Sequence, residues 1–208
     1  MIEVEQRAEV TEQQAAAIGS RLKKEGRQTR SFTRCTLVQI DRSDFEVTTT
    51  GTYDLKLRNN EHGQLLFTVK QVNAFNPTTR LESEVLLEVA QLTELLTNLK
   101  MLGFIYWIMT VEKRETFESD GATWDIIRHL TTGRTLLEVE VPAASDAEIT
   151  AAEKRSDELL ASVNAKPLSD SALHDILSGL NRAHDYQFDL SVVDTDIVAQ
   201  RFTESLNK

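Results

Sequence analysis

Apolar and polar residues alternate along most of the first 142 residues, a pattern that predicts antiparallel β-strands with one buried face. The pattern begins at once, because Ile2 and Val4 alternate with Glu3 and Glu5 in the segment 2–10. Runs rich in β-branched and aromatic residues predict further strands at 33–40, 45–58, 64–72, 79–88, 105–119, 122–130 and 134–142. Neighbouring strands are predicted to pair as hairpins through turn sequences at 59–63, 120–121 and 132–133.

Other segments have the periodicity of helices. Residues 11–27 combine a capping threonine, Thr11, with an alanine-rich body and a glycine near the end. The leucine-rich segment 88–103 has apolar residues at helical spacing and stops at Gly103. Beyond Pro142, which ends the β-rich part, helices are predicted over 145–163, 169–179 and 194–206, the first of them capped by Ser145.

These elements predict an α+β domain over residues 1–142, followed by an acidic helical extension over residues 143–208. A chain of 208 residues is long enough to bury a core without disulfides. The first part contains 17 Lys+Arg and 21 Asp+Glu, and the second contains 6 and 12, so the acidity is concentrated in the extension. A net charge of −10 argues against a broad nucleic-acid-binding surface.

Cysteine usage and the amino terminus indicate a compartment. Cys35 is the one cysteine and cannot form an internal disulfide, which favours reducing surroundings. The opening residues, MIEVEQRAEV, lack the basic-then-apolar layout of a secretory signal, and no apolar run has membrane-spanning length. We therefore expect a cytoplasmic protein that binds neither nucleic acid nor membranes.

Charged residues recur two positions apart within several predicted strands, which places them on one face of each strand. The rows are Glu3-Glu5-Arg7, Lys56-Arg58, Arg80-Glu82-Glu84 and Glu138-Glu140, and Lys70 stands alone in its strand. A solvent-exposed polar face would explain any single row. Carboxylates two apart repel each other unless a cation lies between them, however, and lysine and arginine bind phosphate oxygens. Taken together, the rows indicate metal-dependent triphosphate chemistry.

These segments resemble, in order, the motifs of the CYTH superfamily, the triphosphate tunnel metalloenzymes, which include class IV adenylyl cyclases, thiamine triphosphatases and inorganic triphosphatases. EVEQR resembles the family's opening Glu-x-Glu-x-Lys strand, and DLKLR resembles its paired basic strand. The segments LLFTVK, TRLESE, LKMLGF and TTGRTLLEVEV resemble the later motifs. The resemblance covers about two thirds of the chain.

The resemblance implies an eight-stranded antiparallel β-tunnel, closed like a barrel, with flanking helices. It implies that Mg²⁺ or Mn²⁺ is held by Glu3, Glu5, Glu138 and Glu140, and that Glu3, Glu5 and Arg7 form the catalytic group. It further implies that the substrate phosphates are bound by Arg7, Lys56, Arg58, Lys70, Arg80 and a cation of the pair Lys113 and Arg114. Additional candidates are Glu82, Glu84 and Asp125, the last resembling the aspartate before the family's glycine turn.

The sequence departs from the family's pattern at two places. Arg7 replaces the first-strand lysine, which keeps the positive charge but removes a side chain that can lose its proton and act as a base. Lys113 and Arg114 are adjacent where the family has Lys-x-Arg, and adjacent residues point to opposite faces of a strand. Either Arg114 faces inward with Glu112 and Thr116, or a bulge brings both cations inward; we favour Arg114.

The expected activity is hydrolysis of inorganic triphosphate, thiamine triphosphate or a nucleoside triphosphate. The alternative is a cyclase that converts ATP to cyclic AMP and pyrophosphate, and hydrolysis is favoured because no residues can be assigned to an adenine pocket. A non-catalytic polyphosphate or nucleotide binder and a structural β-protein with acidic helices are further alternatives.

The four histidines form no zinc motif, and His62, His129, His174 and His184 are mostly expected at the surface. The helical extension is expected to pack outside the tunnel, with a lid or a homodimer contact as the other roles considered.

Overall fold

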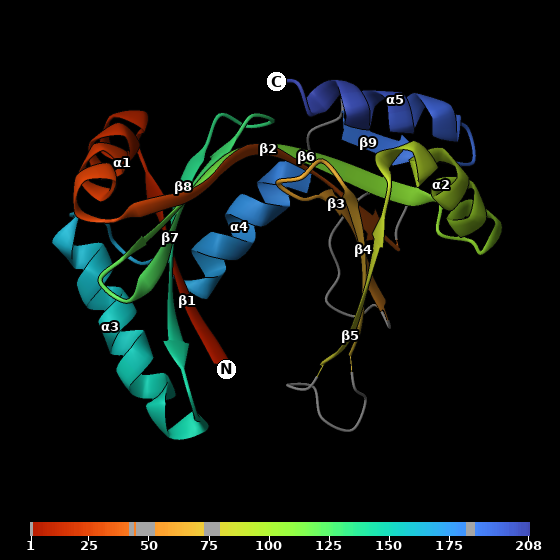
Figure 1. Cartoon of the computed structure of the whole chain (residues 1–208). Helices are drawn as coiled ribbons and strands as arrows, with labels where there is room; N and C mark the ends of the chain where they lie inside the picture. The colour runs from red at the N-terminus through yellow and green to blue at the C-terminus, as the bar shows by residue number, and fades with distance from the viewer. Residues whose placement is uncertain (1, 42–43, 45–52, 73–79, 182–185) are drawn as a thin grey trace. The chain divides into compact units, whose positions relative to one another are not determined.

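The computed structural model describes all residues except 1, 42–43, 45–52, 73–79 and 182–185 (Figure 1). It is an α+β structure built on an antiparallel, nine-stranded sheet. Its strands are β1 Ile2–Val10, β2 Arg27–Ile40, β3 Tyr53–Asn59, β4 Leu65–Val72, β5 Arg80–Leu87, β6 Tyr106–Ser119, β7 Ala122–His129, β8 Thr135–Ala143 and β9 Gln187–Asp189. Its helices are α1 Glu12–Glu25, α2 Leu92–Met101, α3 Ile149–Ser162, α4 Asp170–Asn181 and α5 Thr195–Ser205, with short 3₁₀ turns at Val89–Gln91 and Asp146–Glu148.

The strands pair in the order β1-β8-β7-β6-β2-β3-β4-β5, and β9 adds to the start of β6. Among the described residues, no hydrogen-bonded ladder joins the end strands β1 and β5. The antiparallel α+β fold is confirmed, whereas closure of the sheet into a tunnel stays a prediction. Within the same described residues, no helix has the length and apolar character needed to cross a membrane.

The chain forms two compact units. Unit 1 contains Met1–Phe32 and Glu112–Leu177, and unit 2 contains Thr33–Val111 and Ser178–Lys208. The helices of the acidic extension are thus distributed over both units, with α3 in unit 1 and α5 in unit 2. The predicted boundary at residue 142 stays a prediction.

In unit 1, α1 and α3 cover the apolar face of the strands. Ile18 and Leu22 of α1 pack with Phe117, Trp124 and other buried side chains, and Leu159 and Leu160 of α3 join the same cluster. Thr11 and Gln14 form a capping box that begins α1, so the predicted cap is confirmed. Because strand side chains alternate, this packing directs every second residue of β1, β6, β7 and β8 to the opposite face.

After α3 the chain passes the outer edge of β1 and reaches that opposite face. The backbone N–H of Leu168 donates a 2.7 Å hydrogen bond to the carbonyl oxygen of Arg7, which satisfies one acceptor of this edge strand. Ile176 of α4 then packs on Ile127 and Leu136, so α4 lies against the face that α1 and α3 do not cover (Figure 1).

In unit 2, the strands bury their apolar face beneath α2 and α5. Leu57 and Leu65 of β3 and β4 pack with Leu96 of α2, Phe202 of α5 and Trp107 of β6, all of them essentially inaccessible. Asp194 caps α5 through a 3.2 Å hydrogen bond to the N–H of Asp196. Trp107 and Trp124 are both buried, as packing residues should be.

The hairpin turns fix the register of unit 1. Asp120 and Gly121 have φ angles of 54° and 72°, the left-handed pair that a two-residue turn between right-twisted strands requires. This turn pairs Ser119 with Ala122 and, further along, Glu112 with His129. Gly133, with φ 69°, lies in the connection between β7 and β8.

Most predicted elements are present, with differences at β2, α2, α3 and β9. α2 begins at Leu92 rather than at residue 88, because the 3₁₀ turn Val89–Gln91 precedes it. β2 begins at Arg27, directly after α1, although the charged residues at its start gave no strand pattern. The third predicted helix begins at Ile149 rather than after Ser145, because a 3₁₀ turn comes first and the N–H of Glu148 bonds to the carbonyl of Ser145. β9 was not predicted, since three residues are too few for a period. The part of the predicted strand at residues 45–52 lies outside the described residues.

Candidate functional site

One face of unit 1 carries a cluster of arginines and carboxylates. Register places Arg7 of β1 opposite Glu138 of β8, Glu138 opposite Asp125 of β7, and Thr116 of β6 opposite Asp125. All of these positions point away from the face that α1 covers, because they alternate with the buried residues of the core. The sheet therefore brings together side chains from four strands.

Glu138 lies at the centre of this cluster. Its side chain is only 8% exposed. Arg7 Nε donates a 2.9 Å hydrogen bond to Glu138 Oε2, and Arg114 Nη1 lies 3.9 Å from Glu138 Oε1. Arg7 also forms an ion pair with Glu5 on its own strand. A carboxylate this buried needs charge compensation, and the two guanidinium groups supply it.

Arg114 bridges β6 to β7. Its Nε donates to Glu112 Oε1 at 3.2 Å, and its Nη1 donates to Asp125 Oδ2 at 2.8 Å. Asp125 also accepts a hydrogen bond from the hydroxyl of Thr116. These contacts hold the guanidinium in one orientation on the sheet face.

The structure distinguishes Arg114 from Lys113. Arg114 contributes to the cluster, whereas Lys113 is exposed and lies opposite Arg128 in the strand register. β6 has no bulge at these two residues that would turn both cations to one face. Lys113 has the single partner Arg128 in the regular ladder, and Arg114 has the single partner Ile127. Arg114, and not Lys113, therefore lies on the cluster face with Glu112 and Thr116.

The carboxylates of Glu5 and Glu138 interact with each other. Partial burial, the charge of Glu138 and a hydrogen bond between the two side chains raise the pKa of Glu5 to about 7, although Arg7 opposes this shift. Burial would also raise the pKa of Glu138, but Arg114 and Arg7 outweigh it and lower that pKa. The pair can therefore share a proton near neutral pH, with Glu5 as its holder.

The other predicted metal ligands belong to the same two strands. Glu140 is half-buried and lies opposite Glu5 in the register, and its charge contributes to the raised pKa of Glu5. Glu3 pairs with Pro142 through the backbone, and its side chain lies outside the described part. Among the described side chains, no group of three or more His, Cys, Asp or Glu residues lies close enough together to hold a metal ion.

The carboxylates that β1 and β8 bring together are nevertheless of the chemical type that binds a hard divalent cation. Burial and the neighbouring charge of Glu138 raise the pKa of Glu5 to about 7, and carboxylates placed side by side are the ligand type that Mg²⁺ and Mn²⁺ prefer. Glu5 and Glu138 are two such carboxylates in contact with each other, and Glu140 lies opposite Glu5 on the neighbouring strand.

Unit 2 carries its own charged row on the face opposite its core. Lys56 Nζ lies 2.9 Å from Asp54 Oδ2, and Arg58 Nη2 lies 3.2 Å from Glu84 Oε1. Glu84 also accepts a 3.1 Å hydrogen bond from the hydroxyl of Thr68. Lys56 and Arg58 share one face of β3, and the register through Thr68 of β4 brings Glu84 of β5 to that face as well.

Three further predicted residues of unit 2 are placed by backbone register alone. Lys70 pairs with Asp54 and with Glu82, and Arg80 pairs with Val72. The side chains of Lys70, Arg80 and Glu82 lie outside the described part of the structure.

The sequence did not indicate His129 as a site residue, and it indicated Glu112 only as a neighbour of Arg114 on one face of its strand. His129 was expected at the surface, but it is only 7% exposed, and its Nδ1 lies 3.7 Å from Glu112 Oε2 on the cluster face. Burial lowers the pKa of His129, so the ring is neutral at neutral pH. The signal was available: a two-residue turn at Asp120-Gly121 fixes which residue of β7 lies opposite Glu112.

No family model matches the sequence, and no curated protein matches it. Solved structures do share its fold. The PH1819 protein from Pyrococcus horikoshii OT3 has a TM-score of 0.60 at 19% identity, covering 86% of this chain and 99% of that one. A candidate adenylate cyclase from Vibrio parahaemolyticus has a TM-score of 0.60 at 14% identity, covering 86% and 98%.

A third structure is that of HpAC1 from Hippeastrum, a candidate adenylyl cyclase that reveals a dominant triphosphatase activity. It has a TM-score of 0.52 at 10% identity and covers 84% of this chain and 96% of that one. Identities this low show the fold and nothing finer. The chain therefore has the fold of these candidate adenylate cyclases, one of which is described as a triphosphatase, as the resemblance of its motifs implied.

Proposed function

We propose that this chain is a CYTH-type, metal-dependent enzyme that hydrolyses a triphosphate, bound by the arginine and carboxylate cluster of unit 1. The observation that carries the proposal is the convergence of Arg7 and Arg114 on the buried carboxylate of Glu138, beside the protonatable Glu5. The shared fold with HpAC1 supports the reaction class.

Arg7 and Arg114 would bind phosphate oxygens and neutralise the charge that develops on the transferred phosphoryl group. Both guanidinium groups are already oriented by carboxylates, so little side-chain freedom is lost when the substrate binds. Arg7 cannot act as a base, because a guanidinium keeps its proton at any physiological pH. Positioning and electrostatics, rather than proton transfer at position 7, would supply the catalysis.

Glu3, Glu5, Glu138 and Glu140 would hold Mg²⁺ or Mn²⁺. Such an ion would polarise a phosphoryl oxygen and favour ionisation of an attacking water. Lys56, Arg58, Lys70 and Arg80 stay proposed phosphate ligands, and Glu82 and Glu84 stay further candidates. Asp125 is better suited to orient Arg114 than to bind an ion, because both of its oxygens accept hydrogen bonds.

A class IV adenylyl cyclase is the second candidate function. The fold shared with the candidate adenylate cyclase from V. parahaemolyticus favours it. The same cluster would then stabilise the charge that develops when a ribose hydroxyl attacks the α-phosphate and pyrophosphate leaves.

One activity panel separates these functions. The purified chain is incubated with tripolyphosphate, thiamine triphosphate or ATP, each with Mg²⁺, with Mn²⁺ or with a chelator. Release of orthophosphate from at least one substrate, dependent on the metal, is the expected result. Formation of cyclic AMP and pyrophosphate as the only products would replace hydrolysis with cyclisation, and binding without any turnover would leave a non-catalytic binder.

A pair of variants connects the activity to the cluster. Glu138→Gln removes the central charge and should lower kcat/KM by at least about 100-fold, since it affects both arginines and a proposed metal ligand. Glu9→Gln is the matched control, because Glu9 lies on the same sheet but is paired in solvent with Arg134. Equal activity in the two variants would place the active site elsewhere.

A further inference from the structure

His129 is a buried imidazole on the cluster face of unit 1, and the proposed reaction has so far given it no role. It shares one face of β7 with Asp125, because the two lie at an even spacing along the strand, and it lies directly opposite Glu112 of β6. Its exposed fraction is 7%, against 8% for Glu112, 7% for Asp125 and 6% for Glu138. The ring is therefore as buried as the carboxylates of the cluster.

One nitrogen of this ring lacks a hydrogen bond. The Nδ1 atom of His129 is buried and has no hydrogen-bond partner in the part of the chain that the structure describes. Glu112 Oε2 lies 3.7 Å from it, beyond the length of a hydrogen bond. A buried polar atom without a partner costs free energy, so its presence in a charged cluster calls for a functional explanation.

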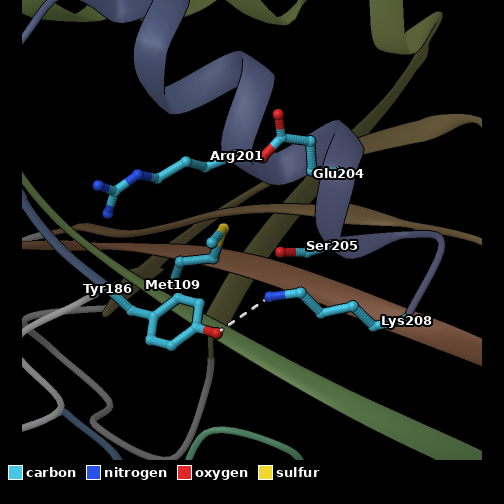
Figure 2. Close-up of a pocket in the computed structure, with 6 residues that line it drawn as sticks. All are labelled: Met109, Tyr186, Arg201, Glu204, Ser205 and Lys208. Carbon is cyan, nitrogen blue, oxygen red and sulfur yellow. Dashed lines mark hydrogen bonds between the residues drawn. The ribbon is translucent and has the colours of Figure 1, made fainter.

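Polar groups at the cavity of unit 2, by contrast, have partners within the chain (Figure 2). This cavity of about 270 Å³ is lined by Met109, Tyr186 and residues of α5 and its end. Lys208 Nζ donates a 3.3 Å hydrogen bond to the Tyr186 hydroxyl, and Glu204 accepts a 2.8 Å hydrogen bond from a neighbour on α5. These polar groups are satisfied, whereas the Nδ1 of His129 is not.

Glu112 would decide which nitrogen of the His129 ring carries the proton. Its Oε1 accepts a 3.2 Å hydrogen bond from Arg114 Nε, which leaves Oε2 for His129. An ionised carboxylate can only accept, so it favours the form of the neutral ring that has its proton on Nδ1. The lone pair of Nε2 is then free. A carboxylate orients a catalytic imidazole in this way, and such contacts are often long until the substrate binds.

The surrounding charges keep this ring able to accept a proton. Burial is the largest influence on the pKa of His129 and lowers it, and the charge of Glu112 opposes this shift. Arg114 and Arg7 lower this pKa further, and Glu138 raises it. Both arginines are thus close enough to act on the charge of the ring. A neutral imidazole beside them can accept a proton, which the guanidinium of Arg7 cannot.

We propose that His129, oriented by Glu112, is the general base of the triphosphate hydrolysis, an inference that rests on the proposed function. Nε2 takes a proton from the attacking water while the water oxygen forms its bond to the terminal phosphorus. The bond from that phosphorus to the bridging oxygen breaks, and its electron pair leaves with the diphosphate part of the substrate. The imidazolium then releases its proton to solvent, which restores the neutral ring.

The position of the proton on the His129 ring is measured first, on the full chain without substrate. The four histidines are labelled with ¹⁵N, and NMR at pH 8 distinguishes protonated from unprotonated ring nitrogens. The signals of His62, His174 and His184 are identified by replacing each with asparagine. A proton on Nδ1 of His129, with Nε2 unprotonated, is the expected result. A proton on Nε2 would overturn the proposal, because that nitrogen could not accept another.

Two amide substitutions then test proton transfer. His129→Asn and His129→Gln can replace hydrogen bonds of the ring, but neither side chain accepts a proton at neutral pH. Each should lower kcat by at least about 100-fold. Orthophosphate release is measured with tripolyphosphate, thiamine triphosphate and ATP, each with Mg²⁺ or Mn²⁺. His62→Asn is the matched control, because His62 is exposed in the turn between β3 and β4, and its turnover should equal that of the wild type.

The outcomes separate this inference from the function on which it rests. Absence of turnover in the wild type would refute the proposed hydrolysis itself. Wild-type turnover in either folded His129 variant would overturn the role of His129 and leave the hydrolysis intact. Circular dichroism shows whether the variants are folded. If both unfold, the wild-type ring decides: a proton on Nδ1 supports the proposal, and a proton on Nε2 overturns it.

Discussion

Arg7 donates a 2.9 Å hydrogen bond from Nε to Oε2 of Glu138, a residue 131 positions later in the chain. The two meet because β1 and β8 pair along their whole lengths, with Arg7 directly opposite Glu138. Arg114 lies at 3.9 Å from the other oxygen of the same carboxylate. The buried charge of Glu138 is thus compensated from two sides, and this compensation can be removed one residue at a time.

Replacing Arg7 with methionine should lower the free energy of unfolding by about 2 kcal/mol, since Glu138 stays buried but loses its closest cation. Urea denaturation at pH 7.5 measures this change. Arg7→Lys should recover part of the loss, because the charge remains while the oriented hydrogen bond does not.

The control for this prediction is Arg134→Met. Arg134 pairs with Glu9 at 3.5 Å, and both side chains are more than 40% exposed, so the expected change is within about 0.5 kcal/mol. Similar losses for Arg7→Met and Arg134→Met would mean that the buried position of Glu138 does not set the cost.

Glu5 should make stability depend on pH between about 4.5 and 7. Its folded pKa of about 7 exceeds the ordinary value of 4.5, so the folded state holds this proton more tightly than the unfolded state. The contribution to stability is fully present below pH 4.5 and is lost as the pH rises to 7. Glu5→Gln should flatten this part of the profile and, at pH 8, should stabilise the chain by about 1 kcal/mol, a figure reduced because the side chain is 35% exposed.

Thermal unfolding followed by circular dichroism across pH 4 to 8 checks this behaviour. Glu9→Gln serves as the control on the same strand and should retain the wild-type profile. A Glu5→Gln variant with an unchanged slope would show that other groups cause the pH dependence.

Gly26 should tolerate no side chain. A Cβ at this position would lie 2.5 Å from the carbonyl oxygen of Glu118 and 2.9 Å from the Cβ of Ser119, so two backbone segments would have to separate. Gly26→Ala is expected to destabilise the chain by about 1–3 kcal/mol. Gly179→Ala is the matched change within α4, where an added Cβ would meet no described atom within 4 Å apart from the helix's own backbone, and it should stabilise by about 0.5 kcal/mol. Urea midpoints that shift in the same direction would contradict this account.

Much of the cluster could be predicted from the sequence because strand periodicity and turn chemistry are local properties. Alternation alone places Glu5 and Arg7 on one face of their strand, and Glu138 and Glu140 on one face of another. What alternation cannot provide is the partner of each strand. The pairing of β1 with β8 joins the two ends of the β-rich segment and follows from packing over the whole unit.

The missed features depend on neighbouring elements rather than on a pattern in their own residues. β9 and the start of β2 have no apolar period of their own and form because neighbouring strands offer hydrogen-bonding edges. His129 lies on the same face of β7 as Ile127, which packs on Ile176 of α4, and a helix pattern does not indicate which side of a sheet the helix will occupy.

The adjacent residues Lys113 and Arg114 allow the sharpest test of the cluster, since they differ in face and in little else. Arg114→Met removes the cation that Glu112, Asp125 and Glu138 share, so three buried acids lose compensation at once. The expected loss is about 3–5 kcal/mol in unfolding free energy, with a fall in triphosphate turnover of at least about 100-fold in protein that remains folded. Lys113→Met, on the opposite and exposed side of β6, should change stability by less than about 0.5 kcal/mol and leave turnover unaltered.

Because Arg114→Met risks unfolding, Arg114→Lys provides the decisive measurement. It keeps one charge among the acids but cannot donate to Glu112 and Asp125 in the same planar geometry. Turnover that falls with Arg114→Lys while the urea midpoint moves by little would assign Arg114 to the substrate, whereas equal turnover in wild type and Arg114→Lys would restrict it to holding β6 and β7 together.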